Sequence, residues 1–177
     1  MASYVAMLRG INVGGRATVA MADLRTLFTD LGYGDVRTYI QSGNVVFRTP
    51  GRAAVLSTAI EERLEGSLGL PLKVVLRTNA QLVKALDRNP LAGGGRDSAK
   101  LHISFLAGAP TSARARAIDP GAYLPDEFRI VGREVYVHCP DGYGRTKLNN
   151  GFFERALDVV ATTRNLQTVA ELTRLSS

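Results

Sequence analysis

Hydrophobic positions in the first 77 residues fall into two patterns, one typical of strands and one of helices. The continuous apolar run at residues 4–8 is typical of a short buried strand. Leu24, Leu27, Phe28 and Leu31 recur at the three- and four-residue spacing of an amphipathic helix. Read in this way, the sequence predicts strands at residues 4–8, 36–41, 44–48 and 72–77 and helices at residues 21–31 and 52–67.

The order of these elements, β-α-β-β-α-β, is that of the ferredoxin-like unit, in which two helices cover one face of a four-stranded antiparallel sheet. Thr78 is a candidate N-cap for a third helix that ends near Asn89 and Pro90. The three glycines at residues 93–95 then read as a flexible linker. We therefore expect a domain boundary there, with a first subdomain at residues 1–92 and a second at residues 93–177.

The second half repeats the order of the first half in a degenerate form. Its pattern predicts strands at residues 100–106, 128–131 and 134–138 and helices at residues 111–117, 149–160 and 165–175. A final helix thus stands where the last strand of the unit is expected. The predicted fold class is α+β, with two ferredoxin-like subdomains built on antiparallel sheets, the second degenerate and ending in helices.

Composition excludes several classes of protein. With 45% hydrophobic and 21% charged residues over 177 positions, the chain is globular and long enough for one domain or two small ones. One cysteine, Cys139, makes no intramolecular disulfide, and two histidines supply too few ligands for a Cys/His zinc site. No apolar run approaches the ~20 residues of a membrane span. We expect a cytoplasmic protein with no membrane contact, metal or cofactor.

The net charge of +6 suggests a nucleic acid or another polyanion as a partner. The charge forms no basic tail or block. Arginine outnumbers lysine by 18 to 4, a ratio that a GC-rich genome also produces without any binding role. The sequence leaves both explanations open, and it carries no sign of the oligomeric state.

A glycine-rich loop follows the first strand and resembles a phosphate-binding loop in part. Arg16 stands where that motif has lysine, and Ala17 stands where it has the Mg²⁺-coordinating Ser or Thr, so a nucleoside-triphosphatase mechanism is not expected. The backbone N–H groups of Gly14 and Gly15, flanked by Arg9 and Arg16, could still hold an anion. A plain connection between strand and helix explains the glycines equally well.

Three further polar segments are candidates. The turn at residues 41–44 contains the Ser42 hydroxyl and the Asn44 amide, which could hydrogen-bond to a ligand. The favoured alternative is that they hydrogen-bond to the backbone of the turn. The loop at residues 141–147 carries Arg145 and Lys147 just before a predicted helix. The two cations could bind a phosphate group, or they could be surface charges in contact with water. The segment at residues 162–165 contains Arg164, which we expect to project into solvent or a cleft beside a helix capped by Thr163.

No set of residues specifies a reaction, so no catalytic residue is assigned. Asp23 and Asp35 have no acidic partner at a useful spacing, and Ser104 lacks the context of a hydrolase nucleophile. His138 and Cys139 are strand neighbours whose side chains point to opposite faces, which disfavours a nucleophile pair.

The segments YVAMLRGINVGG at residues 4–15, TYIQSGNVVF at 38–47 and DGYGRTKL at 141–148 resemble the domain-of-unknown-function family 1697 (DUF1697). The resemblance covers nearly the whole chain and implies a bacterial, cytoplasmic α+β protein with two ferredoxin-like subdomains, but no activity. Two positions depart from it: Arg16-Ala17 replaces Lys-Asn, and Leu166 replaces a tryptophan. The loss of the indole argues against ligand stacking at residue 166.

Together these segments predict a small anionic, phosphate-bearing ligand in a groove shared by the two halves. The candidate binding residues are Arg9, Asn12, Gly14, Gly15, Arg16, Ser42, Asn44, Arg145, Lys147, Arg164 and Asn165. The alternative is a nucleic-acid-binding module that uses a sheet face and the dispersed arginines. We rank it lower because the aromatic signature of RNA-binding sheets is absent. Tyr39 and Phe47 lie on adjacent predicted strands and could be sheet-face aromatics, but Phe47 follows two apolar valines and is better explained as a core residue.

Overall fold

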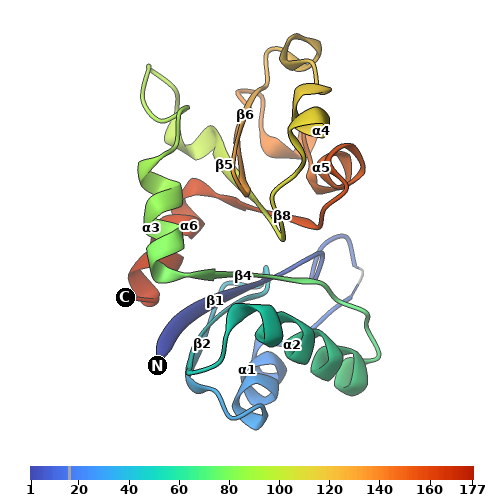
Figure 1. The fold of residues 1–177 in the computed structure, drawn as a ribbon, viewed down its shortest axis with the longest axis vertical. Coiled ribbons are helices and arrows are strands. Elements are labelled where there is room, and N and C mark those ends of the chain that lie inside the picture. Colours follow the sequence, from blue (N-terminus) through green and yellow to red (C-terminus); the bar gives the residue numbers. More distant parts are fainter. Residues whose placement is uncertain (16) are drawn as a thin grey trace. The chain divides into compact units, whose positions relative to one another are not determined.

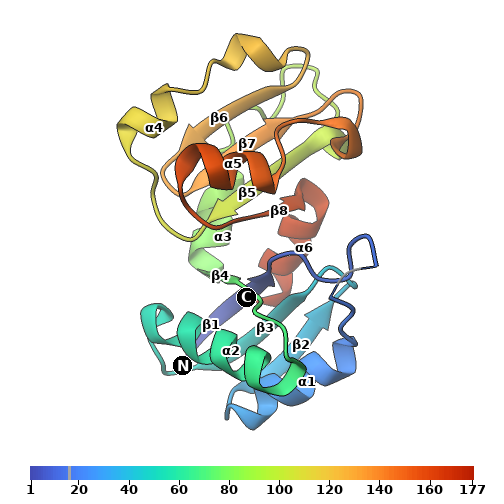
Figure 2. The same cartoon turned by 90° about the vertical axis from the view of Figure 1, so that its right-hand side faces the viewer.

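The computed structural model describes residues 1–15 and 17–177, and the chain divides into two compact units (Figures 1 and 2). The first unit comprises Met1–Val83 together with Glu171–Ser177, and the second comprises Lys84–Ala170. Each unit contains one four-stranded antiparallel sheet and its helices, a mixed arrangement consistent with the α+β class. Among the described residues, no helix is long and apolar enough to cross a membrane.

The first unit has the predicted β-α-β-β-α-β order. Its elements are β1 (Ala2–Leu8), α1 (Met21–Asp30), β2 (Gly34–Tyr39), β3 (Asn44–Thr49), α2 (Ala53–Leu68) and β4 (Val74–Thr78). The strands lie in the order β2-β3-β1-β4, so the first strand is central and the last lies at an edge. In the register, Tyr4 of β1 is opposite Phe47 on one side and Thr78 on the other.

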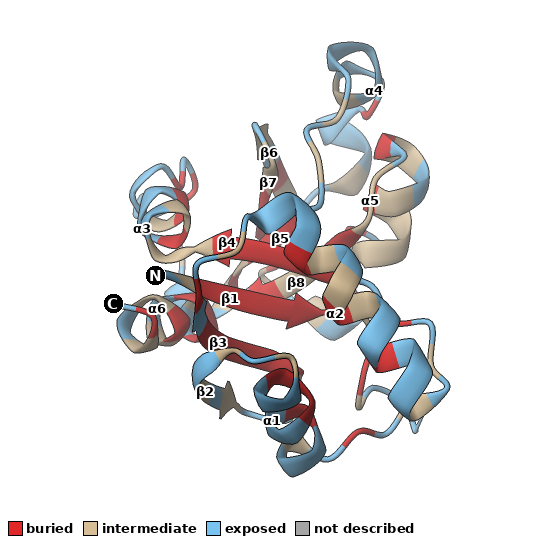
Figure 3. Ribbon diagram, turned by 60° about the horizontal axis from the view of Figure 1, so that its bottom comes forward, coloured by how far each residue is buried: buried red, intermediate tan, exposed pale blue. Residues whose placement is uncertain are grey.

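The core of the first unit lies between the sheet and the helices α1 and α2. Alternate residues of β1, such as Ala6 and Leu8, belong to the same buried cluster as Leu24 of α1 and Ile60 of α2. The outer surfaces of both helices are exposed, whereas β1 and β3 are buried (Figure 3). Phe47 is fully buried in this cluster, which confirms that it is a core residue. Burial of these alternating apolar positions is the main source of the unit's stability.

A glycine fixes the turn between β2 and β3. Gly43 adopts a φ of +76°, and a Cβ added to it would lie 2.5 Å from Cδ1 of Ile11. Its carbonyl accepts a hydrogen bond of 2.9 Å from the backbone N–H of Leu8. Both the left-handed backbone and the close approach require glycine at this position.

The second unit has the same topology. Its elements are β5 (Leu101–Leu106), α4 (Ser112–Arg116), β6 (Glu127–Val131), β7 (Glu134–His138), α5 (Asn150–Leu157) and β8 (Ala161–Asn165), with short 3-10 turns η1 (Ser98–Lys100), η2 (Pro120–Tyr123) and η3 (Tyr143–Arg145). The strand order is β6-β7-β5-β8. Its core includes Val135 and Val137 of β7 with Phe153 and Leu157 of α5.

The strand β8 corrects the prediction that the second half ends in helices without a final strand. β8 pairs with β5 along its whole length, with Arg164 opposite Ile103. Its polar side chains find partners inside the protein: the hydroxyls of Thr163 and Ser104 lie 2.6 Å apart, and Thr163 also donates to Oδ1 of Asn150 over 2.6 Å. Because these hydrogen bonds satisfy the buried polar groups, a strand with little apolar character is stable here.

The helices α3 (Asn79–Asp87) and α6 (Leu166–Leu175) each follow directly on the last strand of a sheet. Thr78 caps α3 as predicted, since its hydroxyl accepts from the Gln81 N–H over 3.3 Å and the Gln81 side chain accepts from the Thr78 N–H over 2.9 Å. Asn165, not Thr163, caps α6 by accepting from the Thr168 N–H over 2.7 Å. The division between the units falls inside both helices. The boundary expected at residues 92/93 stays a prediction.

Candidate functional site

A cavity of about 260 Å³ lies in the second unit, between two connections of the chain. One wall is formed by residues 122–126, which run from the end of η2 to the start of β6. The other wall is formed by Asp141, Gly142, Arg145 and Lys147, which follow β7. The cavity therefore contains both cations of the loop that the sequence singled out.

The hydroxyl of Thr146 joins the two walls. It donates a hydrogen bond of 2.6 Å to Oδ2 of Asp126 and accepts one of 3.0 Å from the backbone N–H of Leu148. Thr146 is buried, whereas its neighbours Arg145 and Lys147 are exposed. The buried threonine thus fixes the position of the segment that carries the two cations.

Backbone hydrogen bonds hold the rest of the loop. The N–H of Gly142 donates to the carbonyl of Cys139 over 3.0 Å, and the N–H of Arg145 donates to the carbonyl of Gly142 over 3.3 Å. Gly142 has a φ of +96°, which glycine adopts without steric cost. The loop is therefore compact and held by its own backbone hydrogen bonds.

Tyr123 anchors the opposite wall to the core. The centroid of its ring lies 5.1 Å from that of Phe152, in a tilted arrangement, and 6.3 Å from that of Phe128, in an edge-on arrangement. The turn that contains Tyr123 is capped by Asp119, whose carboxylate accepts from the Gly121 N–H over 2.9 Å. Aromatic contacts of this kind make the wall a fixed surface.

Three of the four charged side chains of the cavity have no partner among the described residues. In the described part of the chain, Asp141, Arg145 and Lys147 form no side-chain hydrogen bond or ion pair, and all three are exposed. Asp126 is half-buried and carries only the bond from Thr146. Four formal charges, two of each sign, are thus available to a ligand in one small cavity.

Cys139 lies beneath this loop but offers no nucleophile. The side chain is fully buried. Burial raises the pKa of the Cys139 thiol, and a hydrogen bond with Thr146 offsets this only in part. The thiolate, which is the reactive form, is therefore disfavoured at neutral pH.

The candidate residues of the first unit are brought together around the glycine-rich loop. The Asn12 amide donates to the carbonyls of Gln41 over 2.7 Å and Val19 over 3.0 Å, and its Oδ1 accepts from the Val19 N–H over 2.8 Å. The buried Asn44 donates to the Tyr39 carbonyl over 3.1 Å and to the Ser42 hydroxyl over 2.9 Å. These amides support the turn, the alternative that the sequence favoured.

The remaining candidates of this loop differ in their exposure. Arg9 is half-buried, and Gly14 and Gly15 are exposed with positive φ. Arg16 lies outside the described residues. Anion binding by this group stays a prediction.

Arg164 and Asn165 do not line the cavity that holds Arg145 and Lys147. Arg164 is buried rather than projecting into solvent, and it donates to Oγ1 of Thr162 over 2.9 Å and to the carbonyl of Thr163 over 2.8 Å. Burial lowers the pKa of Arg164 to about 10. The expectation of an exposed arginine fails because residue 164 belongs to a strand and not to the loop before a helix.

Sequence reasoning missed Asp126 and the wall at residues 122–125. Asp141 stood in the same segment as the two cations and could have been included on that ground. Asp126 could not, because no pattern links it to a loop that begins 15 positions later. The described residues contain no group of three or more His, Cys, Asp or Glu side chains that could hold a metal.

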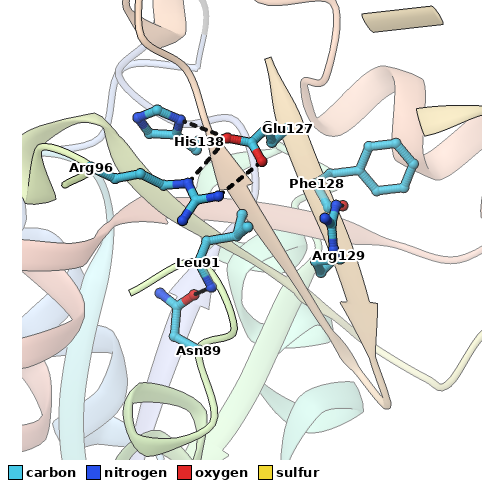
Figure 4. Close-up of polar contacts among 7 residues, drawn as sticks. All are labelled: Asn89, Leu91, Arg96, Glu127, Phe128, Arg129 and His138. Carbon is cyan, nitrogen blue, oxygen red and sulfur yellow. Dashed lines mark hydrogen bonds and ion pairs between the residues drawn. The ribbon is translucent and has the colours of Figure 1, made fainter. Parts of the chain in front are cut away.

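A second polar cluster lies at the start of β6 (Figure 4). Arg96 binds Glu127 through two hydrogen bonds, from Nε to Oε1 over 3.1 Å and from an Nη to Oε2 over 3.0 Å. His138 Nδ1 lies 3.4 Å from Oε1 of the same carboxylate. The hydrogen bond from Arg96 lowers the pKa of Glu127, and the nearby His138 adds to this effect. The cluster joins Arg96, which follows the three glycines at residues 93–95, to strand β6 of the second sheet.

Comparison with known proteins gives a family and a fold. A solved structure described as that of a conserved bacterial protein from Streptococcus pneumoniae is similar, with 23% sequence identity, a TM-score of 0.76 and 99% of each chain covered. At this identity the likeness concerns the fold alone. No protein with a curated description matches the chain. Residues 1–136 match the family described as "Protein of unknown function (DUF1697)", and the chain belongs to that family.

Proposed function

We propose that this protein binds a small anionic ligand, one that bears a phosphate or similar group, in the cavity of the second unit. The observation that carries the proposal is that Arg145 and Lys147 both line this cavity and that neither forms an ion pair with a described residue. A guanidinium offers a planar pair of donors to an oxyanion, and an ammonium adds a second positive charge.

The cavity also limits the size of the ligand. Its volume of about 260 Å³ lies just below the range of about 300–1,000 Å³ that is usual for drug-sized ligands. Gly142 presents no side chain on this wall, so a ligand can approach the backbone closely. A metabolite of the size of a sugar phosphate fits these limits better than a dinucleotide.

We further propose that each unit is ferredoxin-like, with the subdomains dividing at residues 92/93. The support for the fold is the β-α-β-β-α-β order together with a sheet in which the first strand is central and flanked by the third and last strands. Expression of residues 93–177 alone tests the boundary, since a folded product requires that this part carry a complete core.

A thermal-shift screen of nucleotides, sugar phosphates and acidic metabolites tests the binding function. A ligand at 100 times its Kd is expected to stabilise the protein by ~2.7 kcal/mol. The shift should disappear in Arg145→Ala/Lys147→Ala and persist in Arg88→Ala/Arg116→Ala, which removes two exposed cations elsewhere in the same unit. No shift with any anion, or an equal shift in both double variants, would contradict the proposal.

The same variants distinguish the small ligand from a nucleic acid. Labelled single-stranded RNA and DNA are titrated at two salt concentrations. Tight binding that weakens steeply with salt and is lost in Arg145→Ala/Lys147→Ala would favour a nucleic-acid partner. We expect none, because Phe47 is buried in the core of the first unit and is not available for base stacking.

A further inference from the structure

We infer that the ligand of the second unit's cavity carries an ammonium group as well as its anionic group; this deepens the proposed function and rests on it. The cavity is lined by two carboxylates, Asp126 and Asp141, in addition to Arg145 and Lys147. The four groups therefore match a zwitterion better than they match a simple anion.

The carboxylates are free to accept from a ligand. Asp141 is exposed and, in the described part of the chain, has no ion-pair partner although two cations follow it within six positions of the same loop. Asp126 uses Oδ2 to accept from Thr146, which fixes the carboxylate and leaves Oδ1 for another donor. An ammonium group offers three donors and no acceptor, which suits such a pair of oxygens.

Charge repulsion makes the carboxylates selective. A ligand with negative charge alone would be attracted by Arg145 and Lys147 but repelled by Asp126 and Asp141 in the same small volume. A ligand with an ammonium end removes the repulsion and adds an attraction. Such repulsion of the wrong ligand is a common way in which proteins achieve specificity.

The apolar part of the wall suits a short carbon chain between the two charged ends. Leu124 is 69% exposed, and Pro125 stands next to it at the cavity. Methylene groups of a ligand would cover part of this apolar surface and be shielded from water in turn. The inferred class is a small aliphatic amine that carries a phosphate, phosphonate or comparable anionic group.

Isothermal titration calorimetry with two matched probes tests the inference. 3-Aminopropylphosphonate and propylphosphonate share the same anionic group and chain and differ in the ammonium. We expect the full-length protein to bind the aminophosphonate at least about tenfold more tightly, a ratio typical of one charge-assisted contact. In Asp141→Asn, which leaves Asp126 in place, the ratio should fall severalfold, while propylphosphonate binds no more weakly than before.

Asp87→Asn, which removes an exposed carboxylate elsewhere in the second unit, is the control and should keep the ratio of the wild type. Equal affinities of the wild type for both probes would overturn the ammonium inference and leave the proposed anion site standing. Failure of both probes to bind would overturn the inference, and failure of the entire anion screen as well would overturn the proposed function.

A lipid headgroup can present the same two charges on a membrane. Co-sedimentation with vesicles of phosphatidylethanolamine in phosphatidylcholine separates the two sources. We expect the protein to stay in the supernatant. Sedimentation with these vesicles, together with no heat from the free aminophosphonate, would overturn the assignment to a small free molecule.

Discussion

The phenolic hydroxyl of Tyr136 donates a hydrogen bond of 2.8 Å to the backbone carbonyl of Ala85. Tyr136 lies in the middle of β7, is 1% exposed, and reaches a residue 51 positions earlier in the chain. Ala85 belongs to the part of α3 that forms the second unit. The bond thus joins this segment of α3 to the second sheet. The phenol of Tyr136, which can titrate, is buried there.

Tyr136→Phe should lower stability at neutral pH and remove a sensitivity to alkali. Loss of the hydrogen bond costs ~1 kcal/mol. Burial, followed by the negative charge of Glu134, raises the pKa of Tyr136 to about 12. An unfolded chain releases this proton near pH 10, so between pH 10 and 12 the folded state binds more protons and the stability of the wild type falls as pH rises. Urea unfolding across this range should show a flatter slope in the variant.

Tyr39→Phe is the control for this measurement, because its half-buried hydroxyl has no hydrogen bond in the part of the chain that the structure covers. It should leave the stability of the wild type at neutral pH unchanged, because it removes no hydrogen bond among the described residues. If stability fell with rising pH as steeply in Tyr136→Phe as in the wild type, the alkaline sensitivity could not be assigned to Tyr136.

Glu127→Gln should reduce stability at neutral pH by ~1 kcal/mol, a modest value because the paired side chains are about one quarter exposed. Arg96 and His138 lower the pKa of Glu127 below its ordinary value of 4.5. The stabilisation is therefore complete above pH 4.5 and is lost as pH falls through the lower folded-state pKa. Acid unfolding should be less steep in Glu127→Gln than in the wild type and unaltered in Glu62→Gln, which changes an exposed carboxylate.

Gly43→Ala should destabilise the first unit by more than the cost of placing an alanine in a left-handed backbone conformation. The left-handed φ costs ~1–2 kcal/mol for an alanine, and the new Cβ would in addition meet Ile11 at 2.5 Å. Gly14→Ala is the matched control, since Gly14 also has a positive φ but no atom of the described residues lies within 4 Å of its added Cβ. Equal losses in the two variants, measured by urea unfolding, would show that the close approach has no energetic effect.

The first unit could be predicted almost completely, because β1, β3 and β4 are largely apolar and the helices have clear spacing and ends. β8 could not, because Thr162, Thr163 and Arg164 form a polar run that resembles a loop. Local propensity does not reveal that the partners of these side chains lie elsewhere in the fold. One signal was present: Arg164 takes the fourth position of β8, as Arg77 does in β4, and a helix begins two residues after each.

The candidate site could be predicted only in its cations. Arg145 and Lys147 stand together in one glycine-containing loop, so a local pattern was enough. Asp126 enters the site through the hydrogen bond from Thr146, a contact between segments that no sequence pattern connects. The inferred ammonium end of the ligand depends on the two carboxylates, and the sequence alone, which singled out the cations, indicated a simple anion.

His102→Phe should make the protein less sensitive to mild acid. Burial lowers the pKa of His102, and a hydrogen bond with the backbone of Lys100 offsets this in part. Below pH 6.5 the unfolded chain takes up this proton more readily than the folded protein, so stability falls as pH decreases toward the folded-state pKa. Phenylalanine retains a ring beside Tyr143, whose centroid lies 4.5 Å from that of His102. Thermal unfolding between pH 7 and 5 should show a smaller decrease in the variant, and an equal decrease would contradict this account.

Thr146→Val should weaken both the fold and the proposed ligand site, whereas Thr146→Ser should preserve both. Valine has the shape of threonine but leaves the buried Leu148 N–H without its acceptor and Asp126 without its donor, at a cost of ~1–3 kcal/mol. Because the hydroxyl joins the two walls of the cavity, its loss should also lower the affinity for 3-aminopropylphosphonate, although residue 146 is buried and does not line the cavity. Urea unfolding and calorimetry of the two variants measure the two effects. Wild-type affinity in a folded Thr146→Val protein would show that Thr146 supports the fold but does not position the site.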